Sequence, residues 1–219
     1  GHGAGGSITS DSGNTAVGYS ALTAASGGGS DYNTAVGYDA GKTLSGNSNS
    51  NVAIGTYALQ SAAENDRNTV IGYGAAGAFD DGQDGNVVIG YSAGNSINPA
   101  AADYNVIIGF EAGSGGSGDL ANAVIIGANA MNSTAGNDSE GQIAIGYNAL
   151  TAMTSGVSNT CVGYLTGEDI TDENYNTLIG WKAGMNVTSP ANTMVGFQAG
   201  DAYTESSGGA GENTFIGSQ

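Results

Sequence analysis

The stretch Asn105–Gly113, Asn-Val-Ile-Ile-Gly-Phe-Glu-Ala-Gly, recurs in altered form along the whole chain of 219 residues. Its template is Asn, Thr or Val, an apolar residue, Val or Ile, Gly, an aromatic residue, a variable residue, Ala, and Gly or Leu. Twelve copies align at intervals of 16 to 21 residues, a period that predicts a repeat architecture. The copies begin at Asn14, Asn33, Asn51, Asn68, Asn86, Asn105, Ala123, Gln142, Asn159, Asn176, Asn192 and Asn213.

The third and fourth motif positions predict a short β-strand with two apolar faces. The fourth position is Val or Ile in every copy, and β-branched residues favour strand over helix. The third position is apolar throughout, and adjacent strand residues point to opposite faces. One face can line the inside of a coil. The other needs a cover, which predicts contact with a second coil face or a neighbouring subunit.

The fifth motif position is glycine in all twelve copies, which predicts a corner with positive φ or a close backbone approach. An aromatic residue follows in nine copies, which predicts an aromatic ladder. The expected corner residues are Gly18, Gly37, Gly55, Gly72, Gly90, Gly109, Gly127, Gly146, Gly163, Gly180, Gly196 and Gly217. The expected ladder is Tyr19, Tyr38, Tyr73, Tyr91, Phe110, Tyr147, Tyr164, Trp181 and Phe197. The leading Asn suits a turn, and stacked copies would form an amide ladder.

The segments between motifs, here called the connectors, are 7 to 12 residues long and are rich in Gly, Ser, Asn, Asp and Thr. Eighteen of the 20 acidic residues lie outside the motifs, and the connectors hold all of the length variation, which predicts surface loops. We expect residues 1–13 to be a Gly/Ser-rich lead-in and residues 14–219 to be a single solenoid. The predicted fold is all-β, a parallel β-solenoid of about twelve coils, roughly 55 Å long at the spacing of β-strands.

Composition argues against several classes of function. The net charge is −17 with only three basic residues, so nucleic acid is a poor partner and an anionic membrane would repel the chain. No apolar run has the roughly 18 residues that crossing a bilayer requires. With one histidine and one cysteine, a catalytic triad is not expected, and Cys161 at a third motif position reads as a structural thiol. We predict no catalytic residues and a non-enzymatic role, with the Asp172–Glu173 pair as solvated surface.

Two acidic connectors offer the oxygen ligands that Ca²⁺ prefers, although neither matches a known calcium loop. The alternative is that these carboxylates simply keep the rod soluble. Calcium is therefore a secondary expectation, and no other cofactor is expected. The candidate ligands are Asp80, Asp81, Asp84, Asp138 and Glu140.

Two segments carry a resemblance to known repeats. They are Asn14–Leu22, Asn-Thr-Ala-Val-Gly-Tyr-Ser-Ala-Leu, and Ser50–Gly55, Ser-Asn-Val-Ala-Ile-Gly. The pattern resembles the head repeats of trimeric autotransporter adhesins. It is more similar still to Asn-Thr-Ala-Val-Gly-Tyr repeats of bacterial surface proteins and phage tail-fibre proteins. The resemblance spans residues 14–217 and implies an extracellular, cell-surface or virion fibre. The period near 18 residues is longer than that of the adhesin heads.

The leading hypothesis is a structural subunit of an extracellular fibre or filament, assembled by coil stacking and by lateral apolar contacts. Its partners would be copies of itself, in a head-to-tail filament or a trimer. A junction from Gln219 to Gly1 of a second copy would separate successive motifs by 20 residues, within the observed range, and residues 1–13 would then pair with the neighbouring subunit. The alternative is a receptor- or glycan-binding shaft of a trimeric tail fibre or adhesin, with surface glycans as partners.

Overall fold

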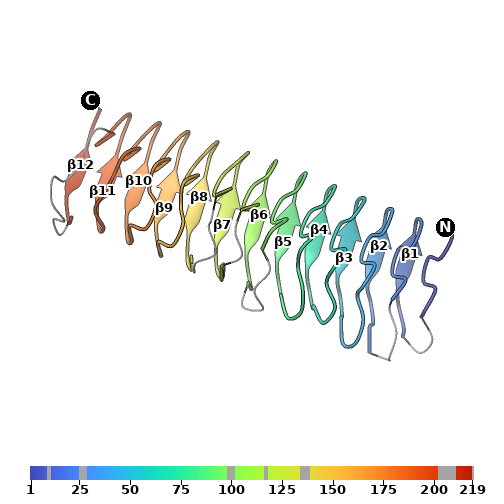
Figure 1. Ribbon diagram of the computed structural model, residues 1–219. Coiled ribbons are helices and arrows are strands. Elements are labelled where there is room, and N and C mark those ends of the chain that lie inside the picture. The colour runs from blue at the N-terminus through green and yellow to red at the C-terminus, as the bar shows by residue number, and fades with distance from the viewer. Residues whose placement is uncertain are drawn as a thin grey trace.

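The computed structural model is a long stack of coils, with one short strand per coil (Figure 1). It describes residues 1–8, 11–24, 29–97, 102–115, 118–133, 139–201 and 211–218. These residues contain no helix, and so none that is long and apolar enough to cross a membrane. The strands are β1 (Thr15–Val17), β2 (Thr34–Val36), β3 (Val52–Ile54), β4 (Thr69–Ile71), β5 (Val87–Ile89), β6 (Val106–Ile108), β7 (Val124–Ile126), β8 (Ile143–Ile145), β9 (Thr160–Val162), β10 (Thr177–Ile179), β11 (Thr193–Val195) and β12 (Thr214–Ile216).

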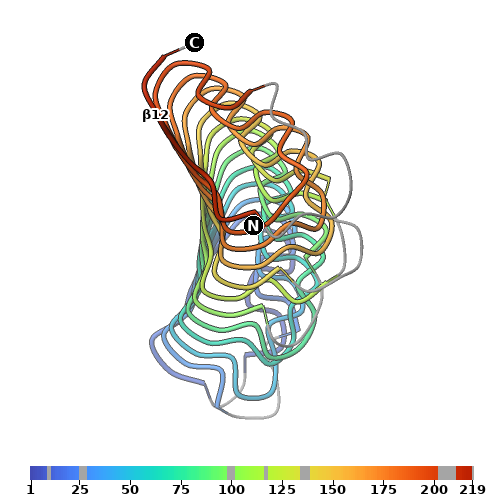
Figure 2. The same cartoon turned by 90° about the vertical axis from the view of Figure 1, so that its left-hand side faces the viewer.

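The strands form one parallel sheet of twelve strands in sequence order, which confirms the predicted β-solenoid. Each strand pairs with the next at equivalent motif positions; Ile107 of β6, for example, lies opposite Ile125 of β7. Hydrogen bonds between coils continue beyond the strands, as from the Glu111 N–H to the Tyr91 carbonyl at 2.9 Å. Viewed along the stack, the strands lie on one side of the coils and the connectors on the other (Figure 2).

The corner glycines explain why the motif never varies at its fifth position. All twelve have φ between 132° and 148°, a conformation that L side chains rarely adopt. A Cβ atom on Gly109 would also lie 2.5 Å from the carbonyl oxygen of Gly127 in the next coil. Both the backbone conformation and the close stacking of coils therefore require glycine here.

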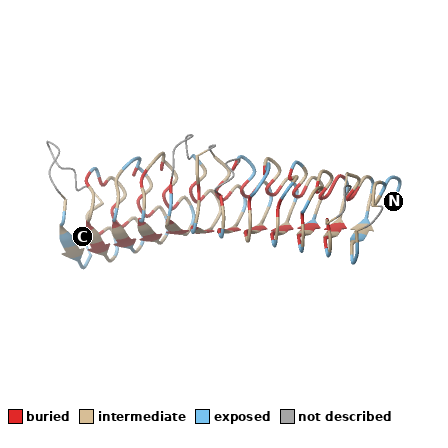
Figure 3. Cartoon of the chain, turned by 90° about the horizontal axis from the view of Figure 1, so that it is seen from below, coloured by how far each residue is buried: buried red, intermediate tan, exposed pale blue. Residues whose placement is uncertain are grey.

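Buried residues recur in coil after coil along the stack (Figure 3). Their apolar side chains form one continuous core. Third-position side chains point inward and are fully buried from β2 to β11, and the alanines two residues after the aromatic position pack beside them. The connectors also contribute to the core, so the prediction that they are only surface loops is wrong. Their apolar residues turn inward to close the side of the coil opposite the strand. These buried connector residues are Leu44, Ala62, Phe79, Ile97, Ala102, Leu120, Met153, Ile170 and Val187.

The leading asparagines form the expected amide ladder inside the coils. The Asn86 carboxamide oxygen accepts hydrogen bonds from the Asn105 backbone N–H at 2.9 Å and from the Asn105 side chain at 3.0 Å. The Asn86 side chain donates in turn to Asn68 at 3.1 Å and to the Ala102 carbonyl at 2.9 Å. Every polar atom of this buried amide is therefore paired, as a buried amide requires. The ladder is interrupted in one coil, by Ala123.

Residues 1–8 pack as the second half of a coil below β1. The Ser20 N–H donates to the His2 carbonyl at 2.9 Å, and the Gly5 N–H donates to the Ala21 carbonyl at 2.9 Å. The His2 ring stacks on Tyr19 with centroids 5.5 Å apart. This segment therefore follows the coil register, although it lacks the strand half of the motif that would have revealed it in the sequence.

Candidate functional site

Candidate functional residues gather on the outer side of the sheet, which we call the outward face. It consists of the first and third residues of every strand, which alternate with the inward residue between them. Because the strands pair in register, these residues form two straight rows along the rod. The first row is Thr15, Thr34, Val52, Thr69, Val87, Val106, Val124, Ile143, Thr160, Thr177, Thr193 and Thr214. The second row is Val17, Val36, Ile54, Ile71, Ile89, Ile108, Ile126, Ile145, Val162, Ile179, Val195 and Ile216.

The outward face consists of Val, Ile and Thr side chains, carries no charge and is open to solvent. Its side chains are mostly half-buried by their neighbours, and the end residues Val17 and Ile216 are 54% and 77% exposed. Two rows about 6.6 Å apart over eleven strand intervals cover on the order of 500 Å² with their flanks. The second row is an uninterrupted stripe of Val and Ile, whereas seven Thr residues place hydroxyl groups in the first row. An exposed apolar patch of a few hundred Å² is often a functional surface.

The aromatic ladder borders this face, and each residue of the predicted ladder directly follows a corner glycine. Tyr73, Tyr91 and Phe110 stack with centroids 5.3 Å apart and planes 9° apart. Tyr164 and Trp181 stack at 6.2 Å, and Trp181 and Phe197 stack at 4.9 Å. The ladder rings are about half exposed, so ring faces cover one another while ring edges meet solvent.

Two coils inside the ladder lack an aromatic residue at the expected position. At Thr56 the following residue, Tyr57, supplies a ring that contacts Tyr38 at 5.5 Å and Tyr73 at 5.7 Å, edge to face. At Ala128 the following residue is Asn129, and no ring lies between Phe110 and Tyr147. The ladder therefore has one unfilled coil among the described residues.

Comparisons with protein-family models, with curated proteins and with solved structures found no match. The chain is a parallel β-solenoid repeat protein. That statement rests on its coils of about 18 residues and on its single continuous sheet.

The candidate calcium ligands are not brought together. Asp80 and Asp81 are exposed, and both oxygens of Asp84 are engaged, one by the Asp66 N–H at 2.7 Å and the other by Arg67 at 3.0 Å. Glu140 is exposed and lies in the connector after the seventh motif, whereas Asp80, Asp81 and Asp84 lie in the connector after the fourth motif. Asp138 lies outside the described residues. In the part of the chain that the structure describes, no group of three or more His, Cys, Asp or Glu side chains could hold a metal ion.

Glu173 has local backbone contacts, and Cys161 belongs to the core. Glu173 accepts hydrogen bonds from the backbone N–H groups of Thr171 at 2.9 Å and Asp172 at 3.2 Å, so it stabilises its own turn. Cys161 is fully buried, and burial raises the pKa of its thiol far above the ordinary value. A protonated, inaccessible thiol is a poor nucleophile.

Two charged contacts involve residues that directly follow a ladder residue in the sequence, Asp39 after Tyr38 and Lys182 after Trp181. Lys42 and Asp39 form an ion pair at 2.9 Å, and the hydrogen bond to Asp39 raises the pKa of Lys42. The Lys182 ammonium lies 4.8 Å from the centroid of the Trp181 ring. The side chain directly after a ladder residue can therefore lie over the ring of that residue. In this case the contact is a cation–π interaction between Lys182 and Trp181.

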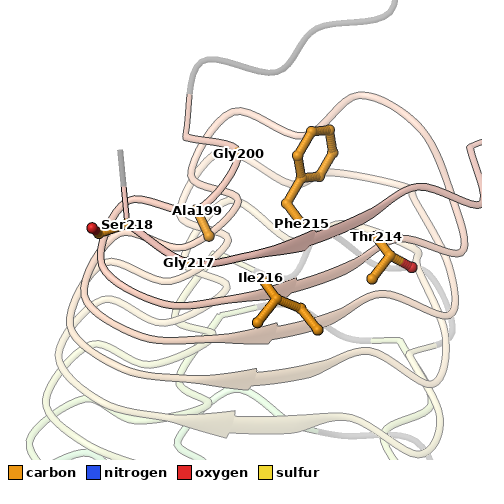
Figure 4. Close-up of a pocket in the computed structure, with 7 residues that line it drawn as sticks. All are labelled: Ala199, Gly200, Thr214, Phe215, Ile216, Gly217 and Ser218. Carbon is orange, nitrogen blue, oxygen red and sulfur yellow. The ribbon is translucent and has the colours of Figure 1, made fainter.

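The described cavity lies at the open end of the last coil (Figure 4). Its volume is about 360 Å³, and no His, Cys, Asp, Glu, Lys or Arg lines it. Phe215 points to the opposite side of β12 from Thr214 and Ile216, as the strand alternation requires (Figure 4). The only side-chain polar groups in this lining are the hydroxyls of Thr214 and Ser218. It is lined by Ala199, Gly200, Thr214, Phe215, Ile216, Gly217 and Ser218.

Sequence reasoning missed two members of the ladder, His2 and Tyr57. Tyr57 stands one position after the template aromatic, where other copies carry a variable residue. The sequence did contain a signal for Tyr57, because it directly follows Thr56, which occupies the aromatic position of that copy. His2 follows Gly1 as each ladder residue follows its corner glycine, but no strand pattern precedes it.

Proposed function

We propose that this chain is a non-enzymatic structural subunit of an extracellular fibre. Copies associate side by side through the outward face, in addition to the stacking of coils along the fibre. The observation that carries the proposal is the pair of uncharged Thr, Val and Ile rows, which run from β1 to β12. A second subunit laid along these rows would remove apolar surface from water over the length of the rod.

The distribution of charge supports the same orientation of subunits. The chain has a net charge of −17, yet none of the outward-face residues is charged. Copies that approach through this face bring together their uncharged sides, whereas copies that approach through the acidic connectors repel one another. The extracellular location follows from the resemblance of the Asn-Thr-Ala-Val-Gly-Tyr units to surface and tail-fibre repeats.

The test is the mass of the particle in solution. Light scattering after size-exclusion chromatography should show an oligomer or a fibre for the natural chain. Ile71→Lys with Ile126→Lys places two charges on the outward face, three coils apart, and should give a folded monomer. Ser61→Lys with Thr171→Lys adds the same charge to exposed connector residues and should leave the oligomer intact.

Two results would contradict the proposal. The natural chain could remain a monomer at high protein concentration, with no fibre visible by negative-stain electron microscopy. Alternatively, the Ile71→Lys, Ile126→Lys variant could form the same particle as the natural chain while circular dichroism shows both to be folded. Either result would remove the outward face as an association surface.

A second candidate function is a shaft that binds receptors or glycans. The exposed aromatic ladder favours it, because Tyr and Trp are enriched at the centres of binding interfaces. A glycan array or a cell-binding assay with Tyr91→Ala and Trp181→Ala would test it. Loss of binding in these variants with the oligomer unchanged would favour the shaft over the purely structural role.

A further inference from the structure

The two rows of the outward face differ in how their residues change along the rod. The second row is Val or Ile in every strand, whereas the first row alternates between Thr and aliphatic stretches. The first row is Thr in β1, β2, β4 and β9–β12, and Val52 of β3 is an isolated aliphatic residue. From β5 to β8 both rows are aliphatic without interruption, and we call this area the central patch. It consists of Val87, Ile89, Val106, Ile108, Val124, Ile126, Ile143 and Ile145.

The central patch is continuous and lies on the surface. In the first row, Val106 lies opposite Val87 of the preceding strand and Val124 of the next. Ile143 of β8 continues the row opposite Val124. Every residue of the patch is half-buried by its neighbours, so each keeps part of its surface in solvent. No hydroxyl or charged side chain interrupts the patch, so its removal from water is favourable.

The patch lies in the middle of the rod. Four strands precede it, β1–β4, and four strands follow it, β9–β12. Two rods that lie along each other with aligned ends therefore bring patch against patch, whether they run in the same or in opposite directions. A shift along the rod would place Val and Ile opposite Thr and would shorten the overlap. The outward face is thus complementary to itself in one register, which is the property that a symmetric interface between identical subunits needs.

The area of the face selects a second copy of the chain as the partner. The central patch spans four strands and covers on the order of 200 Å² with its flanks. A specific interface buries about 1000 Å² or more in total, so a partner seated on the patch alone would bury too little surface. The whole outward face covers on the order of 500 Å², so two aligned copies together bury on the order of 1000 Å². The partner must therefore extend along the rod, as a second copy does.

We propose that the outward face binds a second copy with the ends of the two rods aligned, and that the central patch is the centre of this interface. The inference rests on the lateral association proposed above, and it adds the register and the strongest contacts. The aliphatic centre excludes water, and the Thr hydroxyls toward both ends form a polar rim, as in other specific interfaces. The rim residues are Thr15, Thr34, Thr69, Thr160, Thr177, Thr193 and Thr214.

The test exchanges Val and Thr, which have nearly the same shape, on the outward face of the full chain. Val106→Thr with Val124→Thr places hydroxyl groups in the central patch. Thr occupies the equivalent position in seven coils, so the variant should fold, and circular dichroism checks this. Light scattering over a dilution series gives the concentration at which half of the chains are associated. That concentration should rise about a hundredfold or more, because the hydroxyls lose water without gaining a partner.

The matched control makes the same two changes outside the patch. Val36→Thr and Val195→Thr lie in β2 and β11, each the second strand from an end of the sheet. This variant should change the half-association concentration by less than about threefold, since rim contacts contribute little. The reverse exchange, Thr69→Val with Thr160→Val, extends the aliphatic centre by one strand on each side. It should lower the half-association concentration about tenfold.

The possible failures can be told apart. A natural chain that stays monomeric would refute the proposed function and this inference together. If the natural chain associates but Val106→Thr, Val124→Thr weakens it no more than Val36→Thr, Val195→Thr does, lateral association stands and the central patch is refuted. The Ile71→Lys, Ile126→Lys monomer gives the length of one rod by small-angle X-ray scattering. A laterally associated pair that is longer than this monomer would refute the aligned register.

Discussion

Replacement of Gly109 by alanine should destabilise the solenoid far more than the same change four residues later. Gly109 has φ of 144°, a conformation outside the left-handed region that other residues visit. The added Cβ would lie 2.5 Å from the Gly127 carbonyl oxygen, where no flexible side chain can move aside. The change therefore imposes a strained backbone and a separation of the sixth and seventh coils.

The matched control is Gly113→Ala in the same coil. Gly113 has φ of 55°, and Leu150 and Met131 occupy the equivalent position in other coils with φ of 52° and 46°. An added Cβ there would lie 3.3 Å from the side chains of Ile107 and Ile125, which can adjust. Backbone strain of roughly 1–3 kcal/mol plus a similar cost for the overlap gives about 4 kcal/mol for Gly109→Ala. The left-handed position costs about 1–2 kcal/mol for Gly113→Ala, partly offset by the lower entropy of the unfolded chain.

The assay compares free energies of unfolding from urea titrations followed by circular dichroism. Because coils can unfold in groups, amide hydrogen exchange in β6 and β7 gives a local measure beside the global one. We expect Gly109→Ala to be less stable than Gly113→Ala by about 3 kcal/mol, from the two estimates above. A difference below about 1 kcal/mol would refute the close approach of corner glycines as the reason for their invariance.

Three further predictions concern the interior. Phe79→Ala should lower the free energy of unfolding in urea by about 3–5 kcal/mol, because Phe79 is fully buried. As a control, Asp80→Ala at the exposed neighbouring residue should change it by less than about 0.5 kcal/mol. Asn86→Ala should cost about 3 kcal/mol, because it leaves the Asn105 amide and the Ala102 carbonyl with fewer partners; a thermal melt that matches the natural chain would contradict this. Burial raises the pKa of the Cys161 thiol from its ordinary value of 9.0, so the thiol ionises at lower pH in the unfolded chain than in the folded chain. The free energy of unfolding should therefore fall as the pH rises above about 9, by about 1.4 kcal/mol per pH unit. Cys161→Ala should lack this part of the pH slope, and equal slopes in urea titrations of the two chains would exclude the effect.

The sequence was sufficient to predict the fold class, because the same short motif recurs in every coil. Single features such as the glycine at position 109 are weak, but the same residue at twelve equivalent positions defines a register. Once the register is known, alternation predicts that Ile107 and Ile108 face opposite sides, and the structure shows that Ile107 is the buried one. The leading asparagines also formed their ladder, because a repeated buried amide finds its partner in the next copy.

The connectors could not be predicted in the same way, because their register changes with their length. Phe79, Ile97 and Met153 are buried, yet each lies among glycine and polar residues that read as loop. Each makes its turn through the backbone, as when the Ile97 N–H donates to the Gly94 carbonyl at 3.4 Å. The calcium hypothesis failed to find support for a related reason: acidic residues near one another in sequence point to solvent or to neighbouring coils, as Asp84 does toward Asp66 and Arg67.

The seventh coil shows which interactions hold the stack together. It has Ala123 in place of the leading Asn and Ala128 in place of the aromatic residue, so both ladders are interrupted in the same coil. The strand pairing nevertheless continues, with Ile125 opposite Ile107 on one side and Ala144 on the other, and Ile125 is fully buried. The backbone ladder and the inward third position are therefore sufficient to place a coil. The asparagine and aromatic ladders therefore add to a register that the sheet and the core already define, which leaves the aromatic position free to vary.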